Sequence, residues 1–163
     1  YHRVNFPVHV EVPIVCLALS SGKRSASMFK HKTEVRVRYS ETDRMAYVYY
    51  GNYSFYYETG RVEALRSLGL SYNSMEDDLG VFMPVMNMNV RYLRPCFYDE
   101  LLILETSIIH LPERTIEFET KIYNEKKELA NQGKVTLCFV DVKTKKRVNA
   151  PSIIVDKLKS YFD

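Results

Sequence analysis

Asp43 is the residue best suited to chemistry in this chain, because it lies in a short polar stretch between a predicted strand and a predicted helix. A helix N-terminus presents backbone N–H groups without partners, at the positive end of the helix dipole. Such donors stabilise an oxyanion that develops on a carbonyl, and a nearby carboxylate can act as a general base or a nucleophile. Asp43 beside the start of a helix therefore predicts a hydrolytic site.

Asp43 also has a structural interpretation. Aspartate is common in turns, where its carboxylate accepts a hydrogen bond from the backbone two residues later. For an isolated aspartate this is the commoner role. The choice between the two roles depends on the residues around Asp43.

Cysteine and histidine usage argues against metal chemistry and disulfides. Cys16, Cys96 and Cys138 show no C-x-x-C spacing and are odd in number, which favours a reducing compartment. None of the four histidines forms a ligand-like pair with another histidine or a cysteine. We therefore expect no metal, and we predict a cytoplasmic protein.

Composition sets the outer limits. A chain of 163 residues suits one domain with one core, and 46% hydrophobic with 26% charged residues is ordinary for a globular protein. The net charge of +3 is too small to argue for nucleic acid, and no apolar run is long enough to cross a bilayer. The predicted partners therefore include neither nucleic acid nor a membrane.

Residues 1–27 differ in character from the rest. An apolar run, Val12 to Leu19, precedes a small and polar stretch that ends before Met28. A secretory signal is one interpretation, but it lacks an initiating methionine and a convincing basic region. We expect an N-terminal extension of uncertain origin over residues 1–27 and one domain over residues 28–163.

The elements that must position Asp43 are a strand before it and a helix after it. Residues from Thr33 to Tyr39 alternate between apolar and charged side chains, which predicts a half-buried strand. Apolar residues then recur at helical spacing from Asn52, a suitable N-cap, to Leu68, where Gly69 ends the run.

The remaining chain predicts four strands and two short helices, separated by turn residues. The strands are Phe82 to Leu93, Glu100 to His110, Thr115 to Asn124 and Leu129 to Val142, and the helices are Ser71 to Leu79 and Pro151 to Tyr161. Short connections favour antiparallel neighbours, and an apolar helix must bury its face against the sheet. The predicted fold is α+β, with a curved antiparallel sheet of about five strands wrapped around one long central helix.

The segment from Tyr39 to Glu63 resembles the signature of the hotdog-fold acyl-CoA thioesterases of the 4-hydroxybenzoyl-CoA thioesterase family. That signature is D-x-x-G-x-V-Y-x-x-x-Y followed by E-x-x-R. The corresponding residues are Asp43, Ala46, Val48, Tyr49, Tyr53, Glu58 and Arg61. Only the glycine is replaced, by Ala46. The resemblance extends from about Lys32 to Tyr161 and implies the hotdog fold, which the element order also predicts.

The resemblance implies roles for individual residues. Asp43 falls on the catalytic aspartate, which attacks the thioester carbonyl or activates a water. Tyr50 falls where the family uses a backbone N–H to polarise that carbonyl, and its side chain replaces a histidine common in the bacterial acyl-CoA branch. Tyr39 matches a tyrosine whose hydroxyl can line the site. If the loop needs a positive φ at Ala46, alanine is strained there.

Substrate binding is assigned to five residues. Tyr39, Tyr49 and Asn52 lie close to Asp43 in sequence, and Arg91 and Arg94 carry charges that suit the phosphates of a CoA-type ligand.

The resemblance implies an acyl-CoA or acyl-ACP thioesterase that uses no cofactor and forms its sites at a dimer interface, hence a homodimer or homotetramer. The strand from Phe82 to Leu93 is the candidate for edge pairing between subunits. A non-catalytic module that binds acyl thioesters is the alternative, although a pure binder has no need for Asp43. A hotdog dehydratase would need a histidine near the motif, and His31 and His110 are not placed there.

Overall fold

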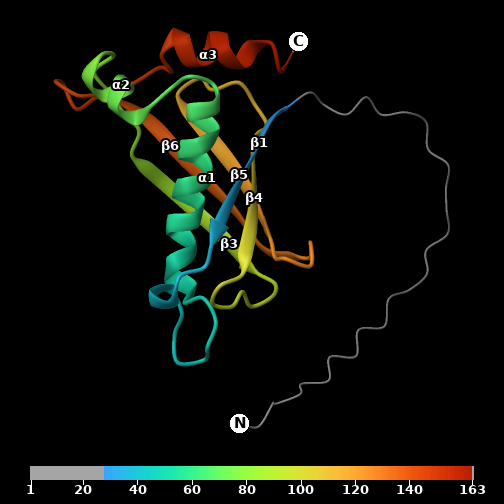
Figure 1. Ribbon diagram of the computed structural model, residues 1–163. Helices are drawn as coiled ribbons and strands as arrows, with labels where there is room; N and C mark the ends of the chain where they lie inside the picture. Colours follow the sequence, from blue (N-terminus) through green and yellow to red (C-terminus); the bar gives the residue numbers. More distant parts are fainter. Residues whose placement is uncertain (1–27, 163) are drawn as a thin grey trace, which may run out of the picture.

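The computed structural model describes residues 28–162, and the predictions for residues 1–27 lie outside them (Figure 1). The elements in chain order are β1 (Phe29–Arg36), the 3-10 turns η1 (Tyr39–Glu41) and η2 (Tyr50–Asn52), α1 (Tyr53–Ser67), α2 (Tyr72–Asp77), β2 (Val81–Phe82), β3 (Val85–Tyr92), β4 (Leu101–Ile108), β5 (Thr115–Tyr123), β6 (Leu129–Asp141), β7 (Arg147–Val148) and α3 (Ser152–Lys159).

The strands form one antiparallel sheet in the order β1-β4-β5-β6, with β3 beside β6 on its other side. The two-residue strands β2 and β7 pair with the end of β6. Five strands of eight or more residues therefore carry the sheet. The predicted α+β fold with an antiparallel sheet and one long helix is confirmed.

Helix α1 lies across one face of this sheet, over β1, β4 and β5 (Figure 1). Two glycines permit the close approach. A Cβ at Gly60 would come 2.5 Å from Oγ1 of Thr106, and a Cβ at Gly133 would overlap the ring of Tyr57. The Tyr57 hydroxyl donates a hydrogen bond to Asn131 in the sheet below. Side chains alternate between this buried face and the outer face along β5, as its pattern predicted.

Most predicted boundaries agree with the structure within two residues, but two strands differ. β1 ends at Arg36, because the backbone of Val37 pairs with Asp99 and Glu100 and the chain then turns into η1. Tyr39 is therefore outside the strand and 78% exposed. The strand predicted from Phe82 to Leu93 is interrupted before β3 by Pro84, which has no N–H for a ladder.

The loop that carries Asp43 projects from the N-terminal end of α1, opposite the end where α2 and α3 lie (Figure 1). It is closed like a small hairpin, with a bridge between Thr42 and Val48 and a hydrogen bond of 3.0 Å from Asp43 N–H to Tyr47 O. Ala46, which donates its N–H to Asp43 O at 2.9 Å, has φ 65°. The loop thus holds alanine in the left-handed conformation that favours glycine.

We predict that Ala46→Gly stabilises the protein. The left-handed conformation costs an L-residue roughly 1–2 kcal/mol, and the greater freedom of glycine in the unfolded chain offsets about 0.4–1 kcal/mol of that gain. The free energy of unfolding, measured in urea, should therefore rise by up to about 1.6 kcal/mol. Ala46→Val, which adds a β-branched side chain at the same φ, should lower it. A less stable glycine variant would contradict this account of the loop.

Candidate active site

Asp43 is partly buried, and only one of its two carboxylate oxygens accepts a hydrogen bond from the described residues. Its Oδ1 accepts a hydrogen bond of 2.7 Å from the N–H of Met45, so the structural interpretation of Asp43 as a turn residue has a basis in the structure. The second oxygen, Oδ2, accepts no hydrogen bond from any group in residues 28–162. The turn therefore orients the carboxylate and leaves one oxygen for a water or a substrate.

The start of the long helix supplies hydrogen-bond donors near the same loop. The turn η2 precedes α1, and the N–H of Asn52 already donates to Tyr49 O at 2.9 Å. Within the described part of the chain, no hydrogen bond uses the N–H of Tyr50 or Gly51. A Cβ at Gly51 would come 2.7 Å from Cε1 of Tyr49, so glycine lets that ring lie against the turn. Two backbone donors are thus available where an oxyanion could bind.

Tyrosine side chains surround this helix start. The rings of Tyr49 and Tyr50 lie 4.5 Å apart, and both are exposed. The hydroxyl of Tyr50, and to a smaller degree the charge of Asp43, raises the pKa of Tyr49. Tyr92 at the end of β3 stacks edge-on against Tyr53 at 5.4 Å and donates its hydroxyl to Tyr50 O at 3.3 Å. β3 and α1 therefore meet at the turn that carries the free donors.

A cleft of about 360 Å³ opens between the Asp43 loop, the start of α1 and the end of β3. Its lining residues are Tyr47, Val48, Tyr50, Tyr53, Tyr92, Leu93, Arg94 and Pro95. Arg94 is the charged residue among them, and its Nε lies 3.6 Å from Oε1 of Glu128. Behind the cleft, burial raises the pKa of the Cys96 thiol, so this wall is uncharged. Aromatic walls with one cation at the rim suit a ligand with an apolar part and an anionic part.

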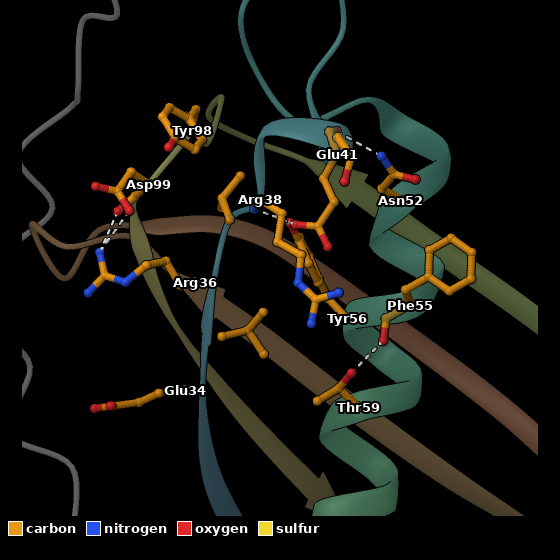
Figure 2. Close-up of a pocket in the computed structure, with 13 residues that line it drawn as sticks. Glu34, Arg36, Arg38, Glu41, Asn52, Phe55, Tyr56, Thr59, Tyr98 and Asp99 are labelled. Atoms are coloured by element: carbon orange, nitrogen blue, oxygen red, sulfur yellow. Dashed lines mark hydrogen bonds and ion pairs between the residues drawn. The ribbon is translucent and has the colours of Figure 1, made fainter.

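A larger cavity of about 840 Å³ lies on the other side of the loop, between β1 and α1 (Figure 2). Asn52 lines this cavity, and its side-chain Nδ2 donates to the carbonyl of Glu41 at 2.7 Å. Asn52 holds the N-cap position of α1, as predicted, but its backbone angles are helical and its side chain makes no capping bond.

The structure brings some of the predicted residues together and separates others. Tyr50 and Arg94 line the smaller cleft, and Asp43 and Tyr49 belong to the loop and turn beside it. Tyr39 instead stacks edge-on against Tyr98 at 5.6 Å. Arg91 lies beside Gln132 and Lys134, on the opposite side of β3 from Tyr92. The roles of all these residues stay predictions.

Two residues that sequence reasoning missed belong to this region. Tyr92 gave no signal beyond its place in a strand, because its contact with Tyr53 joins distant parts of the chain. Glu41 did offer a signal, as an acid only two residues before Asp43.

Residues 28–162 contain no cluster of three or more histidine, cysteine or acidic side chains that could hold a metal ion. In the same part of the chain, no helix is both long and apolar enough to cross a membrane.

Comparison with known proteins identifies the family. Residues 37–158 match the sequence profile of the thioesterase-like superfamily. The chain is 35% identical over 114 residues to YneP of Bacillus subtilis (strain 168), provisionally described as an acyl-CoA thioesterase, which covers 70% of this chain and 82% of YneP. It is 32% identical to the acyl-CoA thioester hydrolase YbgC of Escherichia coli O6:H1, over 75% of this chain and 91% of YbgC.

A solved structure agrees with these relatives. The DHNA-CoA thioesterase from Staphylococcus aureus superimposes with a TM-score of 0.70 and 34% identity, over 74% of this chain and 80% of that one. The expectation of a hotdog-fold thioesterase is confirmed at the level of the family and the fold. The chain belongs to the thioesterase-like superfamily.

Proposed function

We propose that this protein is an acyl-CoA thioesterase in which Asp43 is the base or nucleophile and the start of α1 is the oxyanion site. One observation carries the proposal. A carboxylate with one oxygen free lies in the loop beside a turn whose Tyr50 and Gly51 N–H groups have no acceptor in residues 28–162. The names of YbgC and the Staphylococcus aureus structure, which refer to CoA thioesters, support this substrate class. An acyl group carried by acyl carrier protein (acyl-ACP) is the alternative substrate that the sequence left open.

The proposed reaction needs few groups. The thioester carbonyl oxygen accepts a hydrogen bond from the Tyr50 N–H, which stabilises the negative charge that develops there. Asp43 then either attacks the carbonyl carbon, forming a mixed anhydride and releasing the thiolate, or removes a proton from a water that attacks instead. On the first route, water hydrolyses the anhydride and regenerates the carboxylate. The acyl group would occupy the aromatic cleft of about 360 Å³.

A non-catalytic acyl-thioester binding module is the second candidate. The hydrogen bond of 2.7 Å from the Met45 N–H gives Asp43 a role in the turn that needs no catalysis. The two candidates differ in whether the negative charge of Asp43 matters.

The Asp43→Asn variant separates them. Asparagine keeps an oxygen that can accept the Met45 N–H, so the loop should stay folded. It removes the charge, and the loss of a general base or nucleophile should lower kcat by about 10²–10⁴-fold. The measurement is thiol release from an accepted acyl-CoA, with a thermal melt of each variant. A well-folded Asn variant with near wild-type kcat would favour the binding module.

Substitutions at Tyr50 provide the matched control for the oxyanion donor. Tyr50→Phe keeps the backbone N–H and should keep kcat. Tyr50→Pro removes that N–H at the first position of a helical turn, which proline tolerates, and Tyr49 already has the extended ψ of 133° that a following proline needs. Loss of one oxyanion donor should lower kcat by about 10²–10³-fold. Equal activities of the two variants would remove the Tyr50 N–H from the mechanism.

Arg94 is the better placed of the two predicted phosphate ligands, because it lines the aromatic cleft and Arg91 lies across β3. Exposed ion pairs contribute at most about 1 kcal/mol, so Arg94→Gln should raise KM for an acyl-CoA by roughly twofold to fivefold and weaken its salt dependence. Arg91→Gln is the control with the same loss of charge, and its KM should stay unchanged. A raised KM for Arg91→Gln alone would assign the phosphates to the opposite side of β3.

We further propose that the protein forms a homodimer through β3. In residues 28–162 this strand pairs with β6 alone, which leaves one backbone edge open. All of its side chains except that of Val90 are exposed although several are apolar, with Met86 at 50% and Met88 at 44%. The family resemblance implies sites at such an interface, and Tyr92 joins β3 directly to Tyr53 in the cleft.

Light scattering should give the mass of a dimer, or of a tetramer built from dimers. A charge buried without a partner is costly, so Met88→Lys should shift the protein towards a monomer. Leu79→Lys, at an exposed position after α2, is the matched control and should leave the mass unchanged. A wild-type monomer at micromolar concentration would contradict the proposal.

A cytoplasmic location stays a prediction, which the buried Cys96 and Cys138, unpaired within residues 28–162, support.

A further inference from the structure

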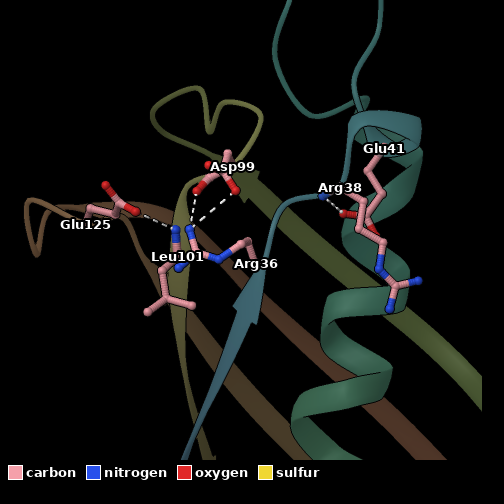
Figure 3. Close-up of polar contacts among 6 residues, drawn as sticks. All are labelled: Arg36, Arg38, Glu41, Asp99, Leu101 and Glu125. Carbon is pink, nitrogen blue, oxygen red and sulfur yellow. Dashed lines mark hydrogen bonds and ion pairs between the residues drawn. The ribbon is translucent and has the colours of Figure 1, made fainter.

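Glu41 is the centre of a hydrogen-bond network between the Asp43 loop and α1 (Figures 2 and 3). Its Oε2 accepts two hydrogen bonds of 2.8 Å, one from the N–H of Arg38 and one from the hydroxyl of Tyr56. Its carbonyl oxygen accepts the side-chain amide of Asn52 at 2.7 Å and the N–H of Tyr49 at 2.9 Å. One residue thus holds the chain before the loop, the turn after it and the helix.

The helix end of this network is buried in the core. Tyr56 is 2% exposed and packs in the core below α1. Burial, and then the hydrogen bond to Glu41, raises the pKa of the Tyr56 phenol, so its hydroxyl keeps the proton that it donates. The Glu41 side chain is therefore tied to a residue that cannot move without disturbing the core.

The loop end of the network leads directly to Asp43. Thr42 follows Glu41, forms the bridge with Val48 and donates its hydroxyl to Tyr39 O at 2.8 Å. Asp43 is the next residue. The position of the Asp43 carboxylate relative to the N–H of Tyr50 therefore depends on the contacts that hold the loop against the helix.

We propose that Glu41 is a positioning residue for the hydrolysis, which holds Asp43 at the working distance from the oxyanion donors of the helix start. This inference rests on the proposed function of Asp43. A displacement of about 1 Å between reacting groups can cost about 10²-fold in rate, so a tether at this point affects turnover more than affinity.

The geometry also says which property of Glu41 matters. A single carboxylate oxygen of Glu41 accepts both hydrogen bonds, one from a backbone N–H and one from a hydroxyl. Among residues 28–162, no ion pair joins Glu41 to the guanidinium of Arg38. A glutamine at position 41 has an amide oxygen that can accept the same two donors. The proposed role is that of an acceptor, and a negative charge is not needed for it.

The test compares kcat and KM of variants that separate these properties. Glu41→Ala removes the acceptor and should lower kcat by about 10–100-fold while KM changes by less than about twofold. Glu41→Gln should retain kcat within about threefold of wild type. Tyr56→Phe removes one donor and should lower kcat by an intermediate factor. Glu34→Ala is the matched control, because Glu34 lines the same cavity and its side chain makes no hydrogen bond or ion pair within residues 28–162. Its kcat should equal that of wild type.

Wild-type kcat in Glu41→Ala, or equal losses in Glu41→Ala and Glu41→Gln, would overturn the proposal. If thermal melts show that Glu41→Ala does not fold, Tyr56→Phe and Glu41→Gln decide. A lower kcat in folded Tyr56→Phe with kcat retained in Glu41→Gln supports the tether, and any other combination rejects it. Asp43→Asn, assayed in parallel, distinguishes failure of the proposed function from failure of this inference. Full activity there rejects the proposed function, whereas an inactive Asp43→Asn beside a fully active Glu41→Ala rejects this inference alone.

Discussion

The close approach of α1 to the sheet is the constraint on which the rest of this structure depends. Gly60 and Gly133 have no Cβ where Thr106 and the Tyr57 ring come close, and Tyr57 uses the space at Gly133 to reach Asn131 on β6. With the helix at this depth, Tyr53 and Tyr56 are buried near its first turn. Each then serves a different neighbour, since Tyr53 meets the end of β3 and Tyr56 meets Glu41. The helix start is thereby fixed relative to both sides of the candidate site.

The same constraint explains why this end of the molecule is rich in exposed aromatic residues. A helix that packs so closely over β1, β4 and β5 leaves β3 uncovered, and the turn before α1 then carries Tyr49 and Tyr50 at the surface. Large apolar side chains exposed together are costly in water unless something covers them. A substrate in the cleft and a second subunit on β3 would cover different parts of this surface. The proposed dimer and the proposed site thus follow from one feature of the packing.

Periodicity in the sequence was enough to predict the sheet and the long helix, because alternation and helical spacing report burial directly. It misplaced Tyr39, since the end of β1 is set by backbone pairing of Val37 with a distant loop. It also implied a capping bond from Asn52, which holds the N-cap position but donates its side-chain amide to the carbonyl of Glu41. Both errors have the same cause. A contact between residues far apart in the chain overrode a local preference, and local patterns carry no record of such contacts.

At the candidate site, the signature pointed to Asp43 and to a backbone donor, and the positive φ of Ala46 agrees with a loop that usually holds glycine. The signature could not supply the side of β3 on which Arg91 and Arg94 lie, because both residues lie outside it.

The small number of groups at the proposed site is itself an argument about the kind of bond that it could break. The two histidines in residues 28–162, His31 and His110, lie on β1 and after β4, away from the Asp43 loop. The Cys96 thiol is buried with a raised pKa, and Tyr53 and Tyr56 likewise have pKa values raised chiefly by burial, so these groups hold their protons firmly. An oxygen ester or an amide needs a proton at its leaving atom, because alkoxides and amide anions are strong bases. A thiolate departs without that help, since free thiols ionise near pH 8.5. One carboxylate and a pair of backbone donors are therefore matched to a thioester, where the leaving group makes the least demand on the protein.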